Sequence, residues 1–113
     1  MVDNLLNKIN QLHFRLNKLL KKNKFSVTVT DQNGAGFKGI FLQAQKPNGT
    51  EPLGVWQKLP NNLKAMKCKN ANDAVTHSSP DFKISVTLEW LPEYDYGDIL
   101  FKFIVSNYYL CTA

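Results

Sequence analysis

The segment Phe82-Lys-Ile-Ser-Val-Thr-Leu-Glu-Trp90 decides the fold class, because apolar and polar residues alternate along its whole length. Its apolar members are Phe82, Ile84, Val86, Leu88 and Trp90. Successive side chains of a β-strand point to opposite faces, so a period of two predicts a strand with one face in a core. We therefore expect all five apolar side chains to point inward.

The same period of two recurs along the chain after residue 24. It predicts further strands at 25–30, 37–45, 55–58, 63–68 and 99–105. Turn residues at 31–36 predict that the first two of these strands form a hairpin. Apolar residues on both faces of 99–105 predict a central strand. Several short strands separated by turns are typical of an immunoglobulin-like antiparallel β-sandwich.

Residues 3–22 show a different period. Leucine and isoleucine recur there at steps of four and three, at Leu5, Ile9, Leu12, Leu16 and Leu19. This spacing predicts an amphipathic helix, with Asp3 as its N-cap. The chain thus divides into a basic helical segment, 1–24, and a mainly β domain, 25–113.

The formal charge of +5 also lies in residues 1–24, where six basic residues stand against Asp3. The remainder of the chain is balanced. A leucine stripe usually packs against another element and a lysine cluster usually faces solvent. We therefore favour a packed helix with solvated lysines over a helix that binds a membrane or nucleic acid. We expect no nucleic-acid partner, and membrane contact only if the chain is part of a longer, anchored protein.

Residues 34–39 spell G-x-G-x-x-G, which occurs in dinucleotide-binding sites. Such a site needs a helix directly after the glycines, whose N-terminus faces the phosphates. Because 37–45 predicts a strand, we interpret the glycines as a turn and expect no cofactor.

His77 lies beside Ser78 and Ser79, with Asp81 close by, which suggests a hydrolase. The chain has no G-x-S-x-G elbow, and a loop histidine more often bonds the backbone, so we predict a structural role and no catalytic residue. The cysteines and histidines lack the close pairs of metal sites, so we expect no metal.

Three further features concern the cellular compartment. Cys68 and Cys111 could form one disulfide, stay as thiols, or belong to different bridges. Asn48-Gly-Thr50 is a glycosylation sequon in a loop expected to be exposed, usable if the chain is secreted. The sequence shows neither a membrane span nor a secretion signal, so on its own it indicates a cytosolic protein.

An ordered series of segments resembles the Reeler (reelin-type) domain family over residues 25–109. In the first half the series is Phe25-Ser-Val-Thr-Val, Gly36-Phe-Lys-Gly-Ile-Phe-Leu-Gln-Ala-Gln45 and Pro52-Leu-Gly-Val-Trp56. In the second half it is Leu63 with Cys68, Asn72-Asp-Ala-Val-Thr-His77-Ser-Ser, the strand ending at Trp90, and Gly97-Asp-Ile-Leu-Phe101.

This resemblance implies a non-catalytic extracellular module, as in reelin and spondin-type matrix proteins and secreted insect defence proteins. Its expected role is recognition or adhesion, including innate defence, with a matrix, glycan or microbial-surface ligand. A second reading is an ectodomain fragment of a membrane protein of the ferric-chelate-reductase type. A third is a cytosolic protein that binds a partner through its leucine stripe.

The chain also departs from the family pattern. Reeler domains usually begin with a secretion signal, an early cysteine and a first strand, and residues 1–24 resemble none of these. The family partner of Cys68 is that early cysteine, so the resemblance implies an N-terminally truncated domain in which Cys68 lacks its usual partner. Cys111 stands where the family more often has an aromatic residue.

Overall fold

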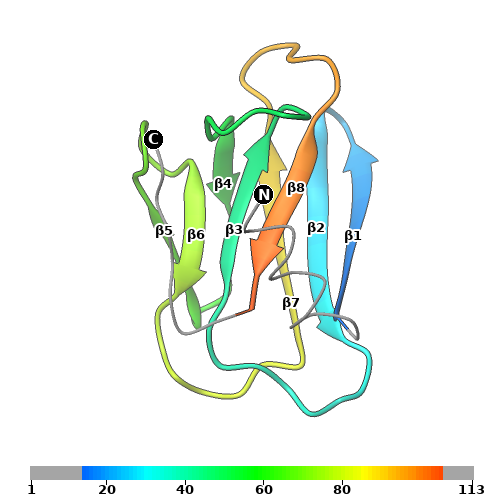
Figure 1. Ribbon diagram of the computed structural model, residues 1–113, viewed down its shortest axis with the longest axis vertical. Coiled ribbons are helices and arrows are strands. Elements are labelled where there is room, and N and C mark those ends of the chain that lie inside the picture. Colours follow the sequence, from blue (N-terminus) through cyan, green and yellow to red (C-terminus); the bar gives the residue numbers. More distant parts are fainter. Residues whose placement is uncertain (1–13, 106–113) are drawn as a thin grey trace.

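The computed structural model describes residues 14–105, which form two antiparallel sheets packed face to face (Figure 1). The strands are β1 Phe14–Lys21, β2 Lys24–Asp31, β3 Phe41–Gln45, β4 Val55–Gln57, β5 Leu63–Met66, β6 Ala74–His77, β7 Ser85–Leu91 and β8 Leu100–Ile104. One sheet has the order β1-β2-β7-β4 and the other β5-β6-β3-β8. The described residues contain no helix, and the expected mainly β, two-sheet architecture is confirmed.

The helix predicted for 3–22 is wrong over residues 14–21, which form β1; residues 3–13 lie outside the described part of the chain. All eight residues of β1 pair with β2. Lys22 and Asn23 have φ values of 49° and 65°, as in the tight type I′ turn that joins twisted strands. Pairing along a whole strand thus overrides helical spacing, and residues 14–24 belong to the first sheet.

Two predictions about strand neighbours are also wrong. Strand β2 pairs with β1 and β7, while β3 pairs with β6 and β8, so residues 32–40 cross between the sheets instead of closing a hairpin. Among the described strands, β8 ends its sheet, whereas β3 is central and buried on both faces. The predictions at 55–58 and 63–68 are confirmed as β4 and β5, and β6 was not expected.

The apolar row from Phe82 to Trp90 is inward for only part of its length. Val86, Leu88 and Trp90 are at most 3% exposed, but Phe82 and Ile84 are 68% and 53% exposed. Strand β7 begins at Ser85, after the row has started. Just before it, Lys83 bridges Phe37 and occupies the buried position instead.

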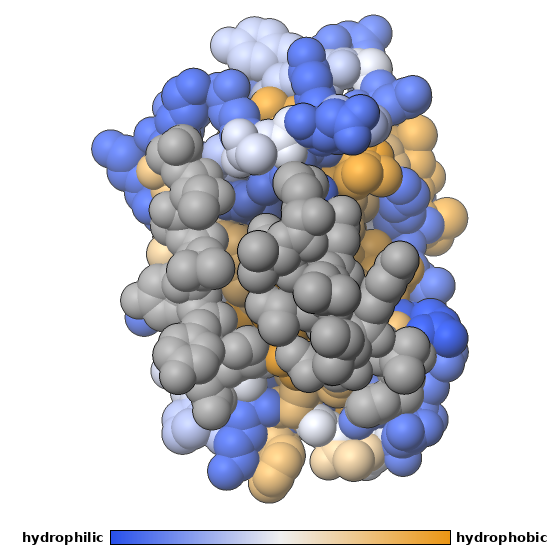
Figure 2. Space-filling model, viewed as in Figure 1, coloured by the Kyte–Doolittle hydropathy of each residue, from blue (hydrophilic) through white to orange (hydrophobic). Residues whose placement is uncertain are grey.

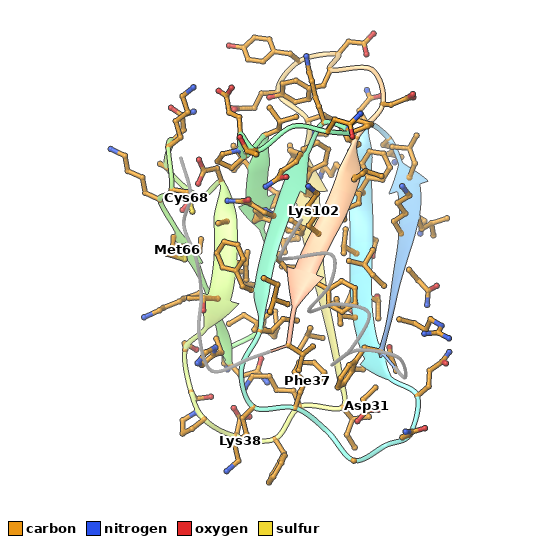
Figure 3. All side chains as sticks on the ribbon, in the orientation of Figure 1. Asp31, Phe37, Lys38, Met66, Cys68 and Lys102 are labelled. Atoms are coloured by element: carbon orange, nitrogen blue, oxygen red, sulfur yellow. The ribbon has the colours of Figure 1, made fainter. Side chains whose placement is uncertain are left out.

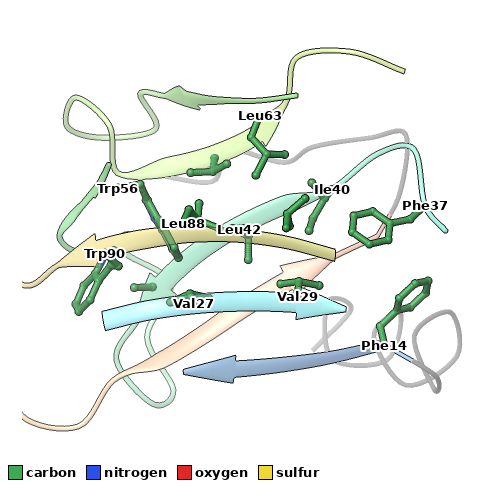
Figure 4. Close-up of a cluster of buried hydrophobic side chains, with 13 residues drawn as sticks. Phe14, Val27, Val29, Phe37, Ile40, Leu42, Trp56, Leu63, Leu88 and Trp90 are labelled. Carbon is green, nitrogen blue, oxygen red and sulfur yellow. The ribbon is translucent and has the colours of Figure 1, made fainter. Parts of the chain in front are cut away.

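A single apolar core fills the space between the sheets (Figure 4). Its largest members include Trp56, Trp90, Ile40, Leu42 and Leu88. The inward side chains of β2, β3 and β7 meet there, as expected for two facing sheets whose residues alternate in and out. This packing fixes the strand ends from which the loops emerge.

Candidate functional site

Four loops meet at one end of the sandwich, at the top of Figure 1, which we call the upper end. They are the β1–β2 turn at 22–23, and the β3–β4, β5–β6 and β7–β8 loops at 46–54, 67–73 and 92–99. This end is largely hydrophilic in the space-filling view (Figure 2). Its loops are placed by contacts with the top of the core.

The β3–β4 loop rests directly on the indole of Trp90. The Trp90 Nε1–H donates a hydrogen bond to the Leu53 carbonyl at 2.9 Å. Gly54 has φ +71°, and a Cβ added there would lie 2.3 Å from the Trp90 ring, well inside van der Waals contact. Only glycine fits both this backbone conformation and this close approach.

A series of aromatic rings runs from the core to the solvent. Phe101 contacts Trp90 edge to face, with centroids 5.2 Å apart. Trp90 in turn contacts Tyr96 at 6.3 Å, and Tyr96 contacts Tyr94 at 5.9 Å and 79°. Trp90 is fully buried while Tyr94 is 74% exposed. The exposed tyrosine is therefore held in place by an aromatic stack that is anchored in the core.

Tyr96 connects two of the loops. Burial raises the pKa of its phenol, and hydrogen bonds to the backbone of Gly54 and Glu93 offset part of that rise. The hydroxyl thus stays protonated at neutral pH. Gly54 belongs to the β3–β4 loop and Glu93 to the β7–β8 loop, so this neutral side chain fixes the spacing between them.

Clefts lie on both sides of the two tyrosines. The first, of about 550 Å³, opens between the β1–β2 turn at Asn23 and the β7–β8 loop. The second, of about 420 Å³, opens toward the β3–β4 loop and Asn70. Glu93, Tyr94 and Tyr96 line both clefts. The tyrosine pair therefore forms a shared wall with open space on each side.

The charged residues that line the first cleft are acidic, and two lysines lie nearby without lining it. Glu93 and Asp95 supply carboxylates from the β7–β8 loop, and Asp95 Oδ1 accepts the Gly97 N–H at 3.1 Å, which shapes that turn. On the opposite side, Lys21 and Lys22 at the tip of the β1–β2 hairpin are exposed. Neither lysine is among the described residues that line the cleft.

The sequence pattern did not predict Glu93, Tyr94 and Tyr96 as site residues, because residues 94–97 were interpreted only as a turn. A signal was present: Tyr94 and Tyr96 alternate with Glu93 and Asp95 in a segment bounded by Pro92 and Gly97. Large aromatic residues are uncommon in short turns, where small polar residues dominate, so their presence indicates a task other than turning the chain.

The cysteine and sequon positions also lie at the upper end. Cys68 is not a free thiol, and its N–H donates to Asp73 Oδ1 at 2.8 Å. The same carboxylate accepts the N–H groups of Lys69 and Asn70, which fixes the β5–β6 loop. Cys111 lies outside the described residues. Asn48 is exposed on the β3–β4 loop, so its amide is accessible.

His77 and the glycine-rich segment take part in hydrogen bonds with the backbone. His77 Nδ1 accepts the Ile40 N–H at 3.2 Å, while Ser79 Oγ instead donates to Asp81. In the glycine segment, the Asp31 carboxylate accepts the N–H groups of Asn33 and Gly36, and no helix follows. Within residues 14–105 no three His, Cys, Asp or Glu side chains gather as metal ligands would. The same range holds no helix of a length and apolarity that could cross a bilayer.

Comparison with known proteins places this geometry in a family. The family model described as "Reeler domain" matches residues 9–110. A curated protein of Antheraea mylitta, named "Putative defense protein 3", is 31% identical over 74 residues, which are 65% of this chain and 44% of that protein. The chain therefore spans less than half of the length of this relative.

Solved structures show the same fold. A crystal structure of the human F-spondin reeler domain aligns with a TM-score of 0.67 and 24% identity, over 85% of this chain and 80% of that one. A structure of the Reelin-N domain of F-spondin aligns with a TM-score of 0.70 and 21% identity, over 85% and 75%. With a family model that matches nearly the whole sequence, the chain belongs to the Reeler domain family.

Proposed function

We propose that this chain is an extracellular, non-catalytic recognition module whose upper end binds a glycan of the matrix or of a microbial surface. The observation that carries this proposal is the exposed Tyr94 ring, held by buried rings and flanked by two clefts. A flat ring with a hydroxyl can stack on one face of a sugar and hydrogen-bond at its edge. Preorganised aromatic side chains lose little conformational freedom on binding.

The relatives support the same class of role. The family includes F-spondin, and a curated relative carries a name that refers to defence. We extend an adhesion or innate-defence role to this chain on that basis. Since the chain spans only part of that relative, further domains of a longer protein could add partners of their own.

Two covalent features fit an extracellular setting. Cys68 is not a free thiol and the chain has two cysteines, which supports a bridge from Cys68 to Cys111. Intact mass spectrometry after alkylation, with and without reduction, tests this bridge. Asn48 is exposed within its sequon, which supports glycosylation in secreting cells. A mobility shift that glycosidase treatment removes, and that Asn48→Gln abolishes, tests the glycan.

The binding proposal is tested with the full chain on an array of matrix and microbial glycans and on whole microbial cells. Tyr94→Ala should remove most of the signal. Phe82→Ala is the matched control, because Phe82 is a similarly exposed ring, 68% against 74%, outside the upper end. Equal binding by the two variants would refute the assignment to the upper end.

A further inference from the structure

We propose that the upper-end clefts select a glycan that carries protonated amines, such as an oligomer of glucosamine, over neutral or sulfated glycans. This inference rests on the proposed function and names the ligand class for the same surface. It follows from the charges that line the clefts, from the shape of the tyrosine wall between them, and from the position of the lysines outside them.

Carboxylates supply the charge of both clefts. The charged residues described along the first cleft are Glu93 and Asp95, and those along the second are Glu51 and Glu93. Neither described lining includes a lysine or an arginine. Glu51 pairs with Lys69, but Glu93 and Asp95 form no ion pair among residues 14–105. Glu93 and Asp95 are therefore available to an incoming cation.

The tyrosine wall strengthens this preference for a cation. The faces of aromatic rings attract ammonium groups, and a carboxylate beside the ring adds a charge-assisted hydrogen bond. Tyr94 is 74% exposed and shares both clefts with Glu93. A sugar ring on Tyr94 would thus place an amine substituent near a carboxylate on either side, and adjacent clefts suit consecutive units of a polymer.

The same charges disfavour two related ligands. An N-acetyl group replaces the ammonium with a neutral amide, so the charge-assisted bond is lost while the stacking surface remains. A sulfated chain would bring negative charge beside Glu93 and Asp95, and would instead be drawn to the exposed Lys21 and Lys22 at the hairpin tip. The lysines and the clefts therefore predict different ligands, which makes the inference testable.

Titration calorimetry of the full chain separates these ligands. The probes are glucosamine oligomers, N-acetylglucosamine oligomers of equal length, and a sulfated glycosaminoglycan. We expect the glucosamine oligomer to bind about tenfold more tightly than its N-acetyl counterpart, from one charge-assisted hydrogen bond. Glu93→Gln should remove about that factor, and Tyr94→Ala should weaken both oligomers. Asp81→Asn, which removes the same charge outside the upper end, should leave binding unchanged.

The outcomes divide cleanly. Equal affinity for the two oligomers, or no effect of Glu93→Gln, would overturn the amine preference but leave the proposed glycan-binding function in place. Binding of the sulfated chain alone, lost in a Lys21→Gln, Lys22→Gln variant, would do the same. Absence of binding to any glycan or microbial surface would overturn the proposed function together with this inference.

Discussion

The two ends of the sandwich differ in where their charged side chains lie: a buried lysine bonds the loops of the lower end, whereas exposed carboxylates line clefts at the upper end. The lower end holds the β2–β3 and β6–β7 loops, with Asp31 and Lys38 among its residues (Figure 3). Polar side chains there form hydrogen bonds with the backbone of these loops. The buried Lys83 Nζ donates to the carbonyls of Lys38, Ser79 and Asp81 at 2.7, 3.0 and 2.9 Å. Asp31, 2% exposed, accepts two loop N–H groups with its carboxylate.

The upper end leaves its chemistry open to solvent. The residues beneath its loops are well ordered by contacts, because Trp90 donates a hydrogen bond to the Leu53 carbonyl and packs against Gly54. Above Trp90, by contrast, Tyr94 and the Glu93 carboxylate line the two clefts. Both ends therefore fix their loops with a buried carboxylate that accepts backbone N–H groups, Asp31 at the lower end and Asp73 at the upper end. The upper end in addition presents Tyr94 and Glu93 on a rigid support, where a ligand can reach them.

The largest expected effect comes from removing Trp90, the buried indole that supports the loops of the upper end. Trp90→Ala should lower the free energy of unfolding by about 3–5 kcal/mol, because a fully buried indole leaves a large cavity. Urea denaturation followed by circular dichroism measures this loss. A loss below about 1 kcal/mol would mean that the aromatic series does not support the loops as described.

Gly54→Ala should have the next largest effect, about 2–4 kcal/mol, since it combines an unfavourable φ with a clash against Trp90. Gly97→Ala is the matched control: Gly97 has φ +76°, yet nothing lies within 4 Å of the added Cβ. It should cost only about 1 kcal/mol. Equal losses in the two variants would show that backbone strain, and not contact with the indole, explains Gly54.

Lys83→Met should destabilise the lower end by about 2–3 kcal/mol, because it removes the buried ammonium that donates to three loop carbonyls. Lys38→Met is the control at the same end, since the Lys38 ammonium lies over the exposed ring of Phe82, 4.9 Å from its centroid. Its cost should stay below about 1 kcal/mol. Glycan binding should survive in Lys83→Met under conditions in which the variant is folded.

The smallest effect is a pH dependence at the lower end. A hydrogen bond from Ser79, followed by one from Lys83, lowers the pKa of Asp81 below its ordinary value of 3.8. The folded state then favours the ionised form, so this contribution is complete above pH 3.8 and is lost as pH falls through the lower, folded pKa. In thermal melts, Asp81→Asn should flatten the acid limb. An unchanged acid limb would contradict the assignment.

The sequence predicted the sheets better than their ends. Alternation along Val86, Leu88 and Trp90 reports burial directly, so the two-sheet core could be predicted from it. The prediction of inward side chains was wrong at Phe82 and Ile84, because Lys83 between them points inward instead. Its ammonium donates to loop carbonyls that only the tertiary fold brings together.

The N-terminal strand and the candidate site could not be predicted from the sequence for a related reason: both depend on tertiary contacts. Leu16 and Leu19 fit a helical spacing. Residues 14–21 nevertheless form a strand, because they pair with the edge of β2 that β7 does not cover, and this pairing is not visible in the sequence. The tyrosine wall depends on the contact of Tyr96 with the buried Trp90 and on the contact of Tyr94 with Tyr96, and an alternating sequence pattern does not encode either contact. The Reeler resemblance, by contrast, was visible in the ordered segments and is confirmed.

The division of labour between the two ends can be tested most directly by mapping backbone amide chemical shifts of the isotopically labelled chain during titration with a glucosamine oligomer. We predict that the perturbed amides cluster at 92–99, around Asn23 and in the β3–β4 loop, while those of 32–40 and 78–84 stay unchanged. Perturbations centred on the loops around Lys83, with a silent upper end, would contradict it.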